Sequence, residues 1–155
     1  MAGESALVKG ENRMSKLIME FNIRIKGEEV SAMNSPQGRV VIIPFDGNVE
    51  SDLFTGEVLP GAADVQQVNA AGIRHMCAQY MFRGKDSQGN DCHLFVENNG
   101  YFEPDSNPSP FKACPTFMTD SPVLAPYLSQ ARFRAEGHPA PQGVCIKIFD
   151  VLEEA

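Results

Sequence analysis

An alternation of apolar and polar residues near the start of the chain constrains the fold more than any other feature of the sequence. It runs from residue 16 to residue 25, and its apolar members are Leu17, Met19, Phe21, Ile23 and Ile25. Successive side chains of a strand point to opposite faces, so a period of two predicts a strand with one buried face. The chain is therefore expected to build its core from strands.

Further strands are indicated by runs of β-branched and aromatic residues between turns that carry Gly, Pro and Asn. These runs lie at 39–45, 50–59, 65–69, 73–83, 91–98, 132–135 and 144–152. Short strands at this spacing predict an all-β sandwich or barrel. The first and last patterned strands, 16–25 and 144–152, are natural partners to close a barrel, because closure removes both exposed edges.

Two segments depart from the strand pattern. Ser121 followed by Pro122 is typical of a helix start, and the next residues have room for about two helical turns, so one short helix is predicted near 122–131. The segment 103–116 carries four prolines, which is too many for a strand ladder. It is interpreted as a connection, either a solvated surface segment, which is favoured, or a flap over a barrel mouth.

The polar segment 84–91 predicts a hairpin connection between two strands. A hairpin that is symmetric about Ser87 pairs Tyr80 with Leu94, Ala78 with Val96 and Met76 with Asn98. Arg74, Tyr80 and Asn98 then share one largely apolar face. A slip of one residue would instead present the opposite face of both strands, which carries His75, Cys77, Gln79, Phe95 and Glu97.

Charge and the length of the apolar runs exclude several classes of protein. The 155 residues suit one domain, taken as 16–155 after a frayed tail at 1–15. Thirteen Lys and Arg against twenty Asp and Glu give a net charge of -7, which argues against nucleic acid and anionic membranes as partners. No apolar run approaches the roughly twenty residues of a membrane helix. The four cysteines form no C-x-x-C pair, so free thiols in a cytoplasmic protein are expected.

Sequence motifs for common cofactors are absent. The chain has no phosphate-binding GxxxxGK[ST], no GxGxxG after a strand, no GxSxG and no HExxH. We therefore expect no cofactor. The only conceivable metal set is His75 and His93 with Glu97, and because two dispersed histidines need further ligands, no metal is predicted.

Several phrases of the sequence match a known pattern. They are GRVVIIPFDGNV from Gly38, LFTGEVLPGAADVQ from Leu53, the Ala78 and Tyr80 pair, and NNG at 98–100. Together they resemble the family called domain of unknown function 3237 over about residues 16–152. The VLPGAAD phrase is the most specific, although Ala62 stands here where the family has a second glycine. The resemblance implies a small antiparallel β-barrel of lipocalin-like proportions with about eight strands, and it implies no established reaction.

Polar groups that would face the interior of such a barrel are the candidate site residues. Asp64 and Gln66 lie two residues apart on extended backbone, so their side chains share a side. Asp64 is interpreted as a general base and Gln66 as the amide that orients it; alternatively, Asp64 caps the turn and Gln66 faces water. Tyr80 is interpreted as a proton donor and Arg74 as the anchor of an anionic group, the alternative being a core tyrosine and an arginine at the rim.

Two functions remain after these exclusions. The first is a cofactor-independent acid/base enzyme, an isomerase, cyclase or lyase, for a small and largely apolar compound with a carbonyl or hydroxyl group. The second is a carrier that binds such a molecule unchanged. The enzyme is favoured because a carrier needs fewer buried polar groups. Its catalytic residues would be Asp64 and Tyr80, and its substrate-binding residues Arg74, Asn98, Gln66 and Glu97. Glu97 enters the cavity only if the hairpin register slips. A filled structural barrel and a homodimer stay open as alternatives.

Overall fold

The computed structural model describes residues 7–10 and 13–154, with side chains described for 15–151. The strands, in chain order, are β1 (Leu7–Gly10), β2 (Arg13–Ile25), β3 (Ser31–Ser35), β4 (Gly38–Glu50), β5 (Phe54–Val58), β6 (Ala63–Asn69), β7 (Arg74–Asp86), β8 (Asp91–Phe102), β9 (Phe111–Thr119), β10 (Phe133–Ala140) and β11 (Gly143–Glu154). The described residues add a short 3-10 turn, η1 (Gly27–Glu29), and one α-helix, α2 (Ala125–Leu128). The protein is all-β, as predicted.

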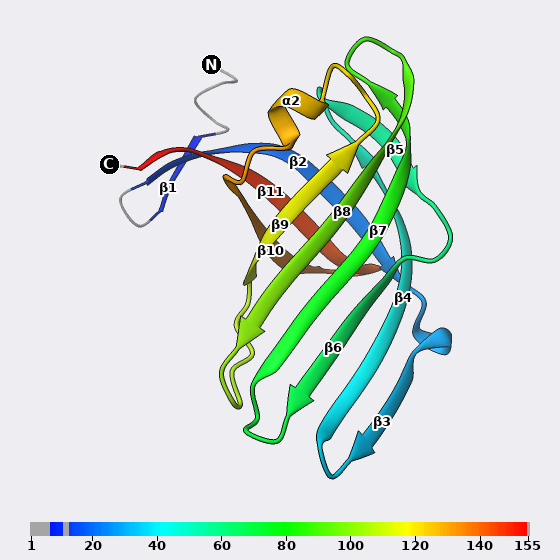
Figure 1. Ribbon diagram of the computed structural model, residues 1–155, viewed down its shortest axis with the longest axis vertical. Coiled ribbons are helices and arrows are strands. Elements are labelled where there is room, and N and C mark those ends of the chain that lie inside the picture. Colours follow the sequence, from blue (N-terminus) through cyan, green and yellow to red (C-terminus); the bar gives the residue numbers. More distant parts are fainter. Residues whose placement is uncertain (1–6, 11–12, 155) are drawn as a thin grey trace.

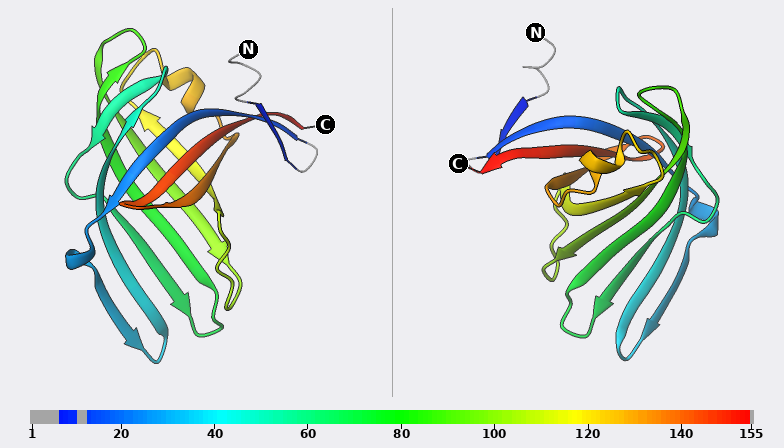
Figure 2. Two further views of the ribbon diagram at one scale, coloured as in Figure 1. Left: turned by 180° about the vertical axis from the view of Figure 1, so that it is seen from behind. Right: turned by 45° about the horizontal axis from the view of Figure 1, so that its top comes forward.

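The strands pair antiparallel, and β2 closes the sheet into a barrel (Figure 1). On one side β2 pairs with β11, and on the other side it pairs with β4. The ring has eight strand positions, of which one is shared by β5 and β6, while β1 and β3 are additional strands. The views in Figure 2 show the same closed ring from behind and with the α2 end tilted forward. The predicted closure by the first and last patterned strands is confirmed.

The range expected to be a frayed tail, 1–15, contains β1 and the first residues of β2. These two strands form an antiparallel hairpin in which Leu7 lies opposite Lys16. The remainder of that range, 1–6 and 11–12, lies outside the described residues. Within the described ranges, no helix is long and apolar enough to cross a membrane.

The barrel wall is interrupted between β5 and β6. β5 pairs with the α2-proximal parts of β4 and β7, and β6 pairs with their distal parts. Between them the segment 59–62 leaves the ladder, although the Leu59 N–H still donates to the Met81 carbonyl at 2.7 Å. Gly61 has a φ of 101°, a backbone conformation that glycine adopts without a steric penalty. The VLPGAAD phrase is thus the place where one barrel position is divided into two strands.

Strand β9 corrects the interpretation of the proline-rich segment. The segment 103–116 was predicted to be a connection throughout, but β9 begins at Phe111 and lies between β8 and β10. Pro115 is accommodated because β10 pairs with β9 only at 111–113, which leaves one side of the strand unpaired at the proline. The sequence also missed β3, whose residues SAMNS are mostly small or polar and show no apolar alternation.

The β7–β8 hairpin presents the predicted face in a different register. Ala78 lies opposite Asn98, whereas the prediction placed it opposite Val96, because the turn is centred on Gln88 instead of Ser87. Moving the centre by one residue shifts every pair by two. Since the side-chain period is two, the same residues still face inward.

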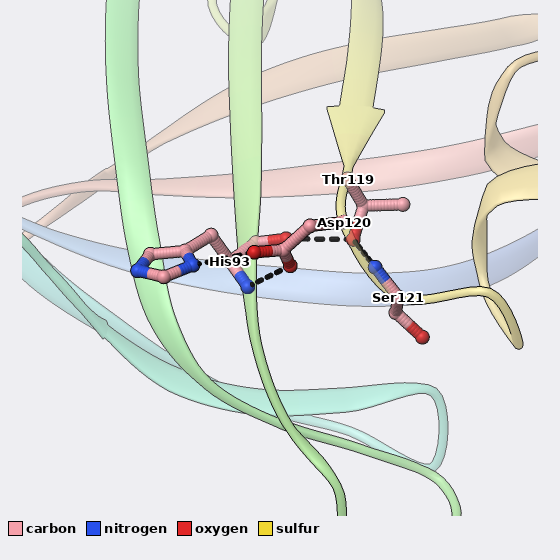
Figure 3. Close-up of polar contacts among 4 residues, drawn as sticks. All are labelled: His93, Thr119, Asp120 and Ser121. Carbon is pink, nitrogen blue, oxygen red and sulfur yellow. Dashed lines mark hydrogen bonds and ion pairs between the residues drawn. The ribbon is translucent and has the colours of Figure 1, made fainter.

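One end of the barrel is closed by α2 and a set of polar contacts. The helix is a single turn, shorter than the two turns that were predicted. Ser121, which is buried, donates its hydroxyl to Asp86 Oδ2 at 2.8 Å and so ties the segment before α2 to the β7–β8 turn. Figure 3 shows a neighbouring link, in which the Thr119 hydroxyl donates to the His93 carbonyl at 2.6 Å and the His93 N–H donates to Asp120 Oδ1 at 2.6 Å.

A buried carboxylate connects α2 to β11. Asp150 is 1% exposed and accepts hydrogen bonds from the Tyr127 hydroxyl at 2.5 Å and from Arg132 Nη2 at 2.9 Å. Burial, followed by the hydrogen bond to Asp150, raises the pKa of Tyr127 to about 12, so the phenol stays a donor. Removing one partner of such a pair would leave an uncompensated buried charge. The contacts of Asp150 with Tyr127 and Arg132 therefore hold α2 against β11 at this end of the barrel.

The barrel interior is filled with side chains at the α2 end. Several of the largest are under 2% exposed, among them Phe21, Phe54, Phe82, Leu94, Leu128 and Ile148. The Phe21 and Phe82 rings lie 4.8 Å apart and tilted, an arrangement that stabilises aromatic pairs beyond their burial. Toward the other end the packing is less complete. Figure 1 shows β4, β6 and β7 extending farther from α2 than β2, β10 and β11 do.

Substitution of Gly84 by alanine tests the close approach of β5 and β7. Gly84 lies opposite Gly56, and a Cβ atom on Gly84 would meet the Thr55 carbonyl oxygen at 1.9 Å. Because the obstacle is backbone, we expect Gly84→Ala to lower the free energy of unfolding by about 1–3 kcal/mol in urea titrations. The control is Gly27→Ala, where no atom lies within 4 Å of the new Cβ. Equal stability of the two variants would contradict the close approach.

Candidate functional site

A cavity of about 170 Å³ lies inside the barrel, toward the end away from α2. A cavity of about 150 Å³ accommodates one benzene ring, so this space suits a molecule with a single ring. Strands β2, β4 and β11 supply an apolar wall made of Ile23, Ile25, Ile43, Phe45, Val144 and Ile146. The opposite wall, from β6, β7 and β8, carries the polar groups. The interior is therefore not filled at this end, and polar side chains face it.

Five of the six predicted site residues line this cavity, namely Asp64, Gln66, Arg74, Tyr80 and Asn98. The register explains how they meet: Asp64 on β6 lies opposite Ala78 on β7, and Ala78 lies opposite Asn98 on β8. Neighbouring strands are about 4.8 Å apart, so Asp64 and Asn98 are two strand spacings apart. Because Ala78 has a small side chain, the space between the two polar groups stays open.

Asp64 lines the cavity and has one carboxylate oxygen without a partner among the described residues. Its Oδ2 accepts a hydrogen bond from Gln66 Nε2 at 2.8 Å. Its Oδ1 is buried and accepts no hydrogen bond from the described residues. Burial raises the pKa of Asp64 above its ordinary value, and the Gln66 hydrogen bond and the Arg74 charge oppose this shift. The arrangement is that of an oriented carboxylate whose basicity is increased by its surroundings.

Tyr80 is 4% exposed and packs among aromatic rings. The centroids of the Phe45 and Phe21 rings lie 5.0 Å and 6.0 Å from that of Tyr80, both in edge-on geometry. Burial raises the pKa of Tyr80 far above 10, and the nearby Asp64 carboxylate raises it further. The hydroxyl therefore stays protonated and acts as a hydrogen-bond donor. Although Tyr80 is a core aromatic, its side chain also lines the cavity.

Asn98 is 2% exposed and is the second polar group without a partner. Its Oδ1 is buried and accepts no hydrogen bond from the described residues. An unsatisfied buried amide costs about 1–3 kcal/mol, so such groups are rare unless something else satisfies them. Two orphaned oxygens, on Asp64 and Asn98, thus belong to residues that line the same cavity.

Gln66 connects Asp64 to Arg74. While its amide nitrogen donates to Asp64, its Oε1 accepts a hydrogen bond from Arg74 Nη1 at 3.0 Å. The side-chain amide is thereby held at both ends, and it fixes the orientation of the Asp64 carboxylate. The Arg74 guanidinium lies 4.3 Å from the centroid of the Phe102 ring, in cation–π contact.

Glu97 does not line the cavity, which corrects its assignment as a substrate-binding residue. It neighbours the inward-facing Asn98 along β8, so its side chain points to the outer surface. There its carboxylate accepts hydrogen bonds from Gln79 Nε2 at 2.8 Å and from Asn99 Nδ2 at 3.0 Å. Because the observed register differs by two residues from the predicted one, the slip that would have turned Glu97 inward does not occur.

The histidines considered for a metal site lie on the outer surface with other partners. His75 Nε2 lies 2.8 Å from Asn99 Oδ1, and its ring stacks on Tyr101 with centroids 4.3 Å apart. His93 Nδ1 lies 2.8 Å from Asp120 Oδ2, as drawn in Figure 3. Within the described part of the chain, no three His, Cys, Asp or Glu side chains are grouped closely enough to hold a metal ion.

Sequence reasoning missed two residues at the cavity mouth. Asn107, in the connection between β8 and β9, reaches the cavity, as does Phe111 at the start of β9. The Phe111 ring packs over Gly137, where a Cβ atom would meet the ring at 1.9 Å. The cluster of prolines before β9 was the available signal, and the flap alternative for that segment anticipated a position at the mouth.

The fold and the cavity together define the class of protein, a small closed antiparallel β-barrel with a pocket of single-ring size in its interior. Residues 15–151 match the family model described as protein of unknown function DUF3237, and the chain belongs to that family. The chain is also 30% identical over 129 residues to a UPF0311 protein of Clostridium acetobutylicum, covering 74% of this chain and 78% of that protein. Family membership, as implied by the VLPGAAD phrase, is confirmed.

Solved structures show the same barrel. A protein with unknown function from Clostridium acetobutylicum gives a TM-score of 0.71 at 24% identity, over 88% of this chain and 98% of the other. A conserved protein of unknown function from Rhodopseudomonas palustris gives 0.67 at 26% identity, over 89% and 97%. A beta-barrel like protein from Acinetobacter baumannii gives 0.66 at 19% identity, over 88% and 95%.

Asp64→Asn is expected to change stability in a pH-dependent way. Burial raises the pKa of Asp64 above 3.8, so the folded chain keeps this proton to a higher pH than the unfolded chain does. The free energy of unfolding of the wild type therefore falls as pH rises from the unfolded pKa through the folded pKa. Because asparagine does not titrate, Asp64→Asn should gain stability relative to the wild type over the same rise, measured by urea unfolding at a series of pH values.

Asp91→Asn serves as the control of opposite sign. The hydrogen bond from Lys85, followed by its charge, lowers the pKa of Asp91, so its stabilising effect is present above 3.8 and is lost as pH falls. The relative stability of Asp91→Asn should therefore decrease slightly as pH rises. If Asp64→Asn differs from the wild type by the same amount at every pH, the raised pKa of Asp64 is wrong.

Proposed function

We propose that this barrel is a cofactor-independent acid/base enzyme, of the isomerase, cyclase or lyase type, that acts on a small and largely apolar carbonyl compound. The observation that carries the proposal is the Asp64 carboxylate, which lines a largely apolar cavity and has one oxygen held by Gln66 and the other buried without a partner among the described residues. A carrier would gain nothing from an unpartnered carboxylate oxygen beside an apolar pocket, because burying an unpaired carboxylate is unfavourable. A general base needs both features.

The first chemical step would be proton abstraction next to the carbonyl group. Asp64 Oδ1 takes the proton from this carbon, the C–H electron pair becomes the carbon–carbon double bond of an enolate, and the carbonyl π pair moves onto oxygen. The Tyr80 hydroxyl and the Asn98 amide N–H are the donors available to stabilise that oxygen. Because the pKa of Tyr80 is strongly raised, the tyrosine donates a hydrogen bond and keeps its proton.

The three reaction types differ only in how the enolate is consumed. In an isomerase, the Asp64 carboxylic acid returns its proton to a different atom of the same π system. In a lyase, the enolate electron pair expels a group from the neighbouring carbon, and that group takes the proton. In a cyclase, the enolate carbon bonds to a second electrophilic carbon of the same molecule, whose oxygen takes the proton. Asp64 is the only carboxylate among the described cavity residues, so one base serves both halves of the reaction.

Deuterium exchange tests the shared first step without knowledge of the natural substrate. Small cyclic ketones are incubated with the protein in deuterated buffer, and loss of the C–H signal next to the carbonyl is followed by nuclear magnetic resonance. We expect exchange above the buffer rate for ketones that enter the cavity. Asp64→Asn and Tyr80→Phe should each slow it about a hundredfold or more, the usual contribution of a positioned acid or base.

Matched surface variants control for nonspecific effects. Asp91→Asn and Tyr101→Phe change the same residue types at exposed positions outside the cavity, so they should exchange at the wild-type rate. Exchange by Asp64→Asn at the wild-type rate would overturn the role of Asp64. Ketone binding without exchange in the wild type would overturn catalysis and favour the carrier, for which the apolar wall of β2, β4 and β11 is sufficient.

A further inference from the structure

Arg74 has a guanidinium with unused hydrogen-bonding capacity at the mouth of the cavity. It is the first residue of β7 and is partly buried. One of its N–H groups donates to Gln66, and one face of the guanidinium lies over Phe102. In the part of the chain that the structure describes, no carboxylate forms an ion pair with it. An arginine has five N–H donors, so most of its donors are available.

On the cavity side Asp64 acts on Arg74 across the Gln66 side chain, and further acidic residues approach Arg74 from the outer side. Glu103 and Asp105, in the connection that also carries Asn107, share with Arg74 an adjoining hollow outside the cavity. Both are exposed, and neither forms an ion pair with Arg74. The guanidinium is thus held by an amide and a ring, has no direct ion pair among the described residues, and meets Asp64 only across Gln66. A partly buried guanidinium with free donors is suited to bind an anion.

We propose that Arg74 binds a carboxylate group of the substrate, so that this barrel prefers small oxo acids to neutral carbonyl compounds of the same size. The inference rests on the proposed role of Asp64 and specifies the substrate of the same site. Arginine suits this task because its planar fork matches the two oxygens of a carboxylate. Contact with Phe102 and Gln66 holds the guanidinium in place, which reduces the entropy that is lost on binding.

The path from Arg74 to Asp64 sets the orientation and length of the substrate. Both residues hydrogen-bond the same Gln66 side chain, so guanidinium and carboxylate are two hydrogen bonds apart. An acid with its carboxylate on Arg74 would place the far side of a single ring beside Asp64, Tyr80 and Asn98. The carbonyl group therefore belongs opposite the carboxylate. The cavity volume of about 170 Å³ agrees with a molecule of this size.

Substrate binding would also adjust the base. The positive charge of Arg74 lowers the pKa of Asp64. When a substrate carboxylate neutralises that charge, the opposing effect is removed and Asp64 becomes more basic. The same ion pair would then recognise the substrate and increase the basicity of the catalytic carboxylate when the substrate is in place.

Calorimetric titration with two matched probes tests the inference. The first probe is cyclohexanone with a carboxylate on the ring carbon opposite the carbonyl, and the second is its primary amide. We expect the wild type to bind the acid at least about tenfold more tightly than the amide. Arg74→Gln should reduce this ratio to near one, and Arg74→Lys should keep a part of it. Arg39→Gln, an exposed arginine bound to Asn34, should leave the ratio unchanged.

The outcomes separate this inference from the proposed function. Equal binding of acid and amide by the wild type, a ratio that survives Arg74→Gln in a variant with a normal unfolding curve, or binding of neither probe at millimolar concentration would each overturn carboxylate recognition. Glu103→Gln and Asp105→Asn should tighten acid binding by removing repulsion. Since the readout is binding, an intact ratio in a protein that shows no deuterium exchange would support carboxylate recognition and reject catalysis.

Discussion

Closure of the sheet through β2 is the constraint on which the rest of the molecule depends. Once β2 pairs with both β4 and β11, every strand has a fixed inner face, and alternate residues of each strand share one enclosed space. An eight-position ring is just wide enough for side chains to fill it. Large side chains such as Phe54, Phe82 and Leu128 do so near α2, whereas farther away the small Ala78 leaves space between Asp64 and Asn98. The cavity is thus a consequence of side-chain size along strands whose direction is already set.

The polar lining of that cavity lowers the stability of the barrel, because buried polar groups without partners are unfavourable. Asp64 and Asn98 each keep a buried oxygen with neither a hydrogen bond nor an ion pair among the described residues. Asp150, at the other end, accepts hydrogen bonds from Tyr127 and Arg132 at Oδ2, and its Oδ1 lies 2.8 Å from Arg132 Nε in an ion pair. The protein therefore contains one buried carboxylate that is ion-paired, Asp150, and one that is not, Asp64. The carboxylate paired with Arg132 lies at the closed end of the barrel, and the carboxylate with an unpartnered oxygen belongs to a residue that lines the cavity. Orphaned polar groups tend to concentrate where function requires them.

The sequence predicted the fold and most of the site because both depend on which face a residue occupies. Alternation assigned Arg74, Tyr80 and Asn98 to one face, and that assignment is insensitive to an error of two residues in the hairpin register. Contacts between particular side chains were harder to predict from the sequence. The bridge that Gln66 makes to Arg74 requires the pairing of β6 with β7, and the approach of Asn107 requires the path of an irregular connection. Pro115 led to a wrong prediction of a connection at this position. A strand can contain this proline because β10 stops pairing with β9 before it, which the sequence does not show.

Because of the break between β5 and β6, the strand pairing at one end of the barrel does not depend on the pairing at the other end. β6 takes its register from β4 and β7, not from β5, so the number of residues in the break does not determine which way Asp64 points. Pro60 and Gly61 are exposed, and a Cβ atom on Gly61 would meet no atom within 4 Å. New chain ends or an inserted domain are best tolerated at such surface positions. The wall therefore has a surface break a few residues from the cavity, where an insertion would leave the orientation of Asp64 to the pairing of β6 with β4 and β7.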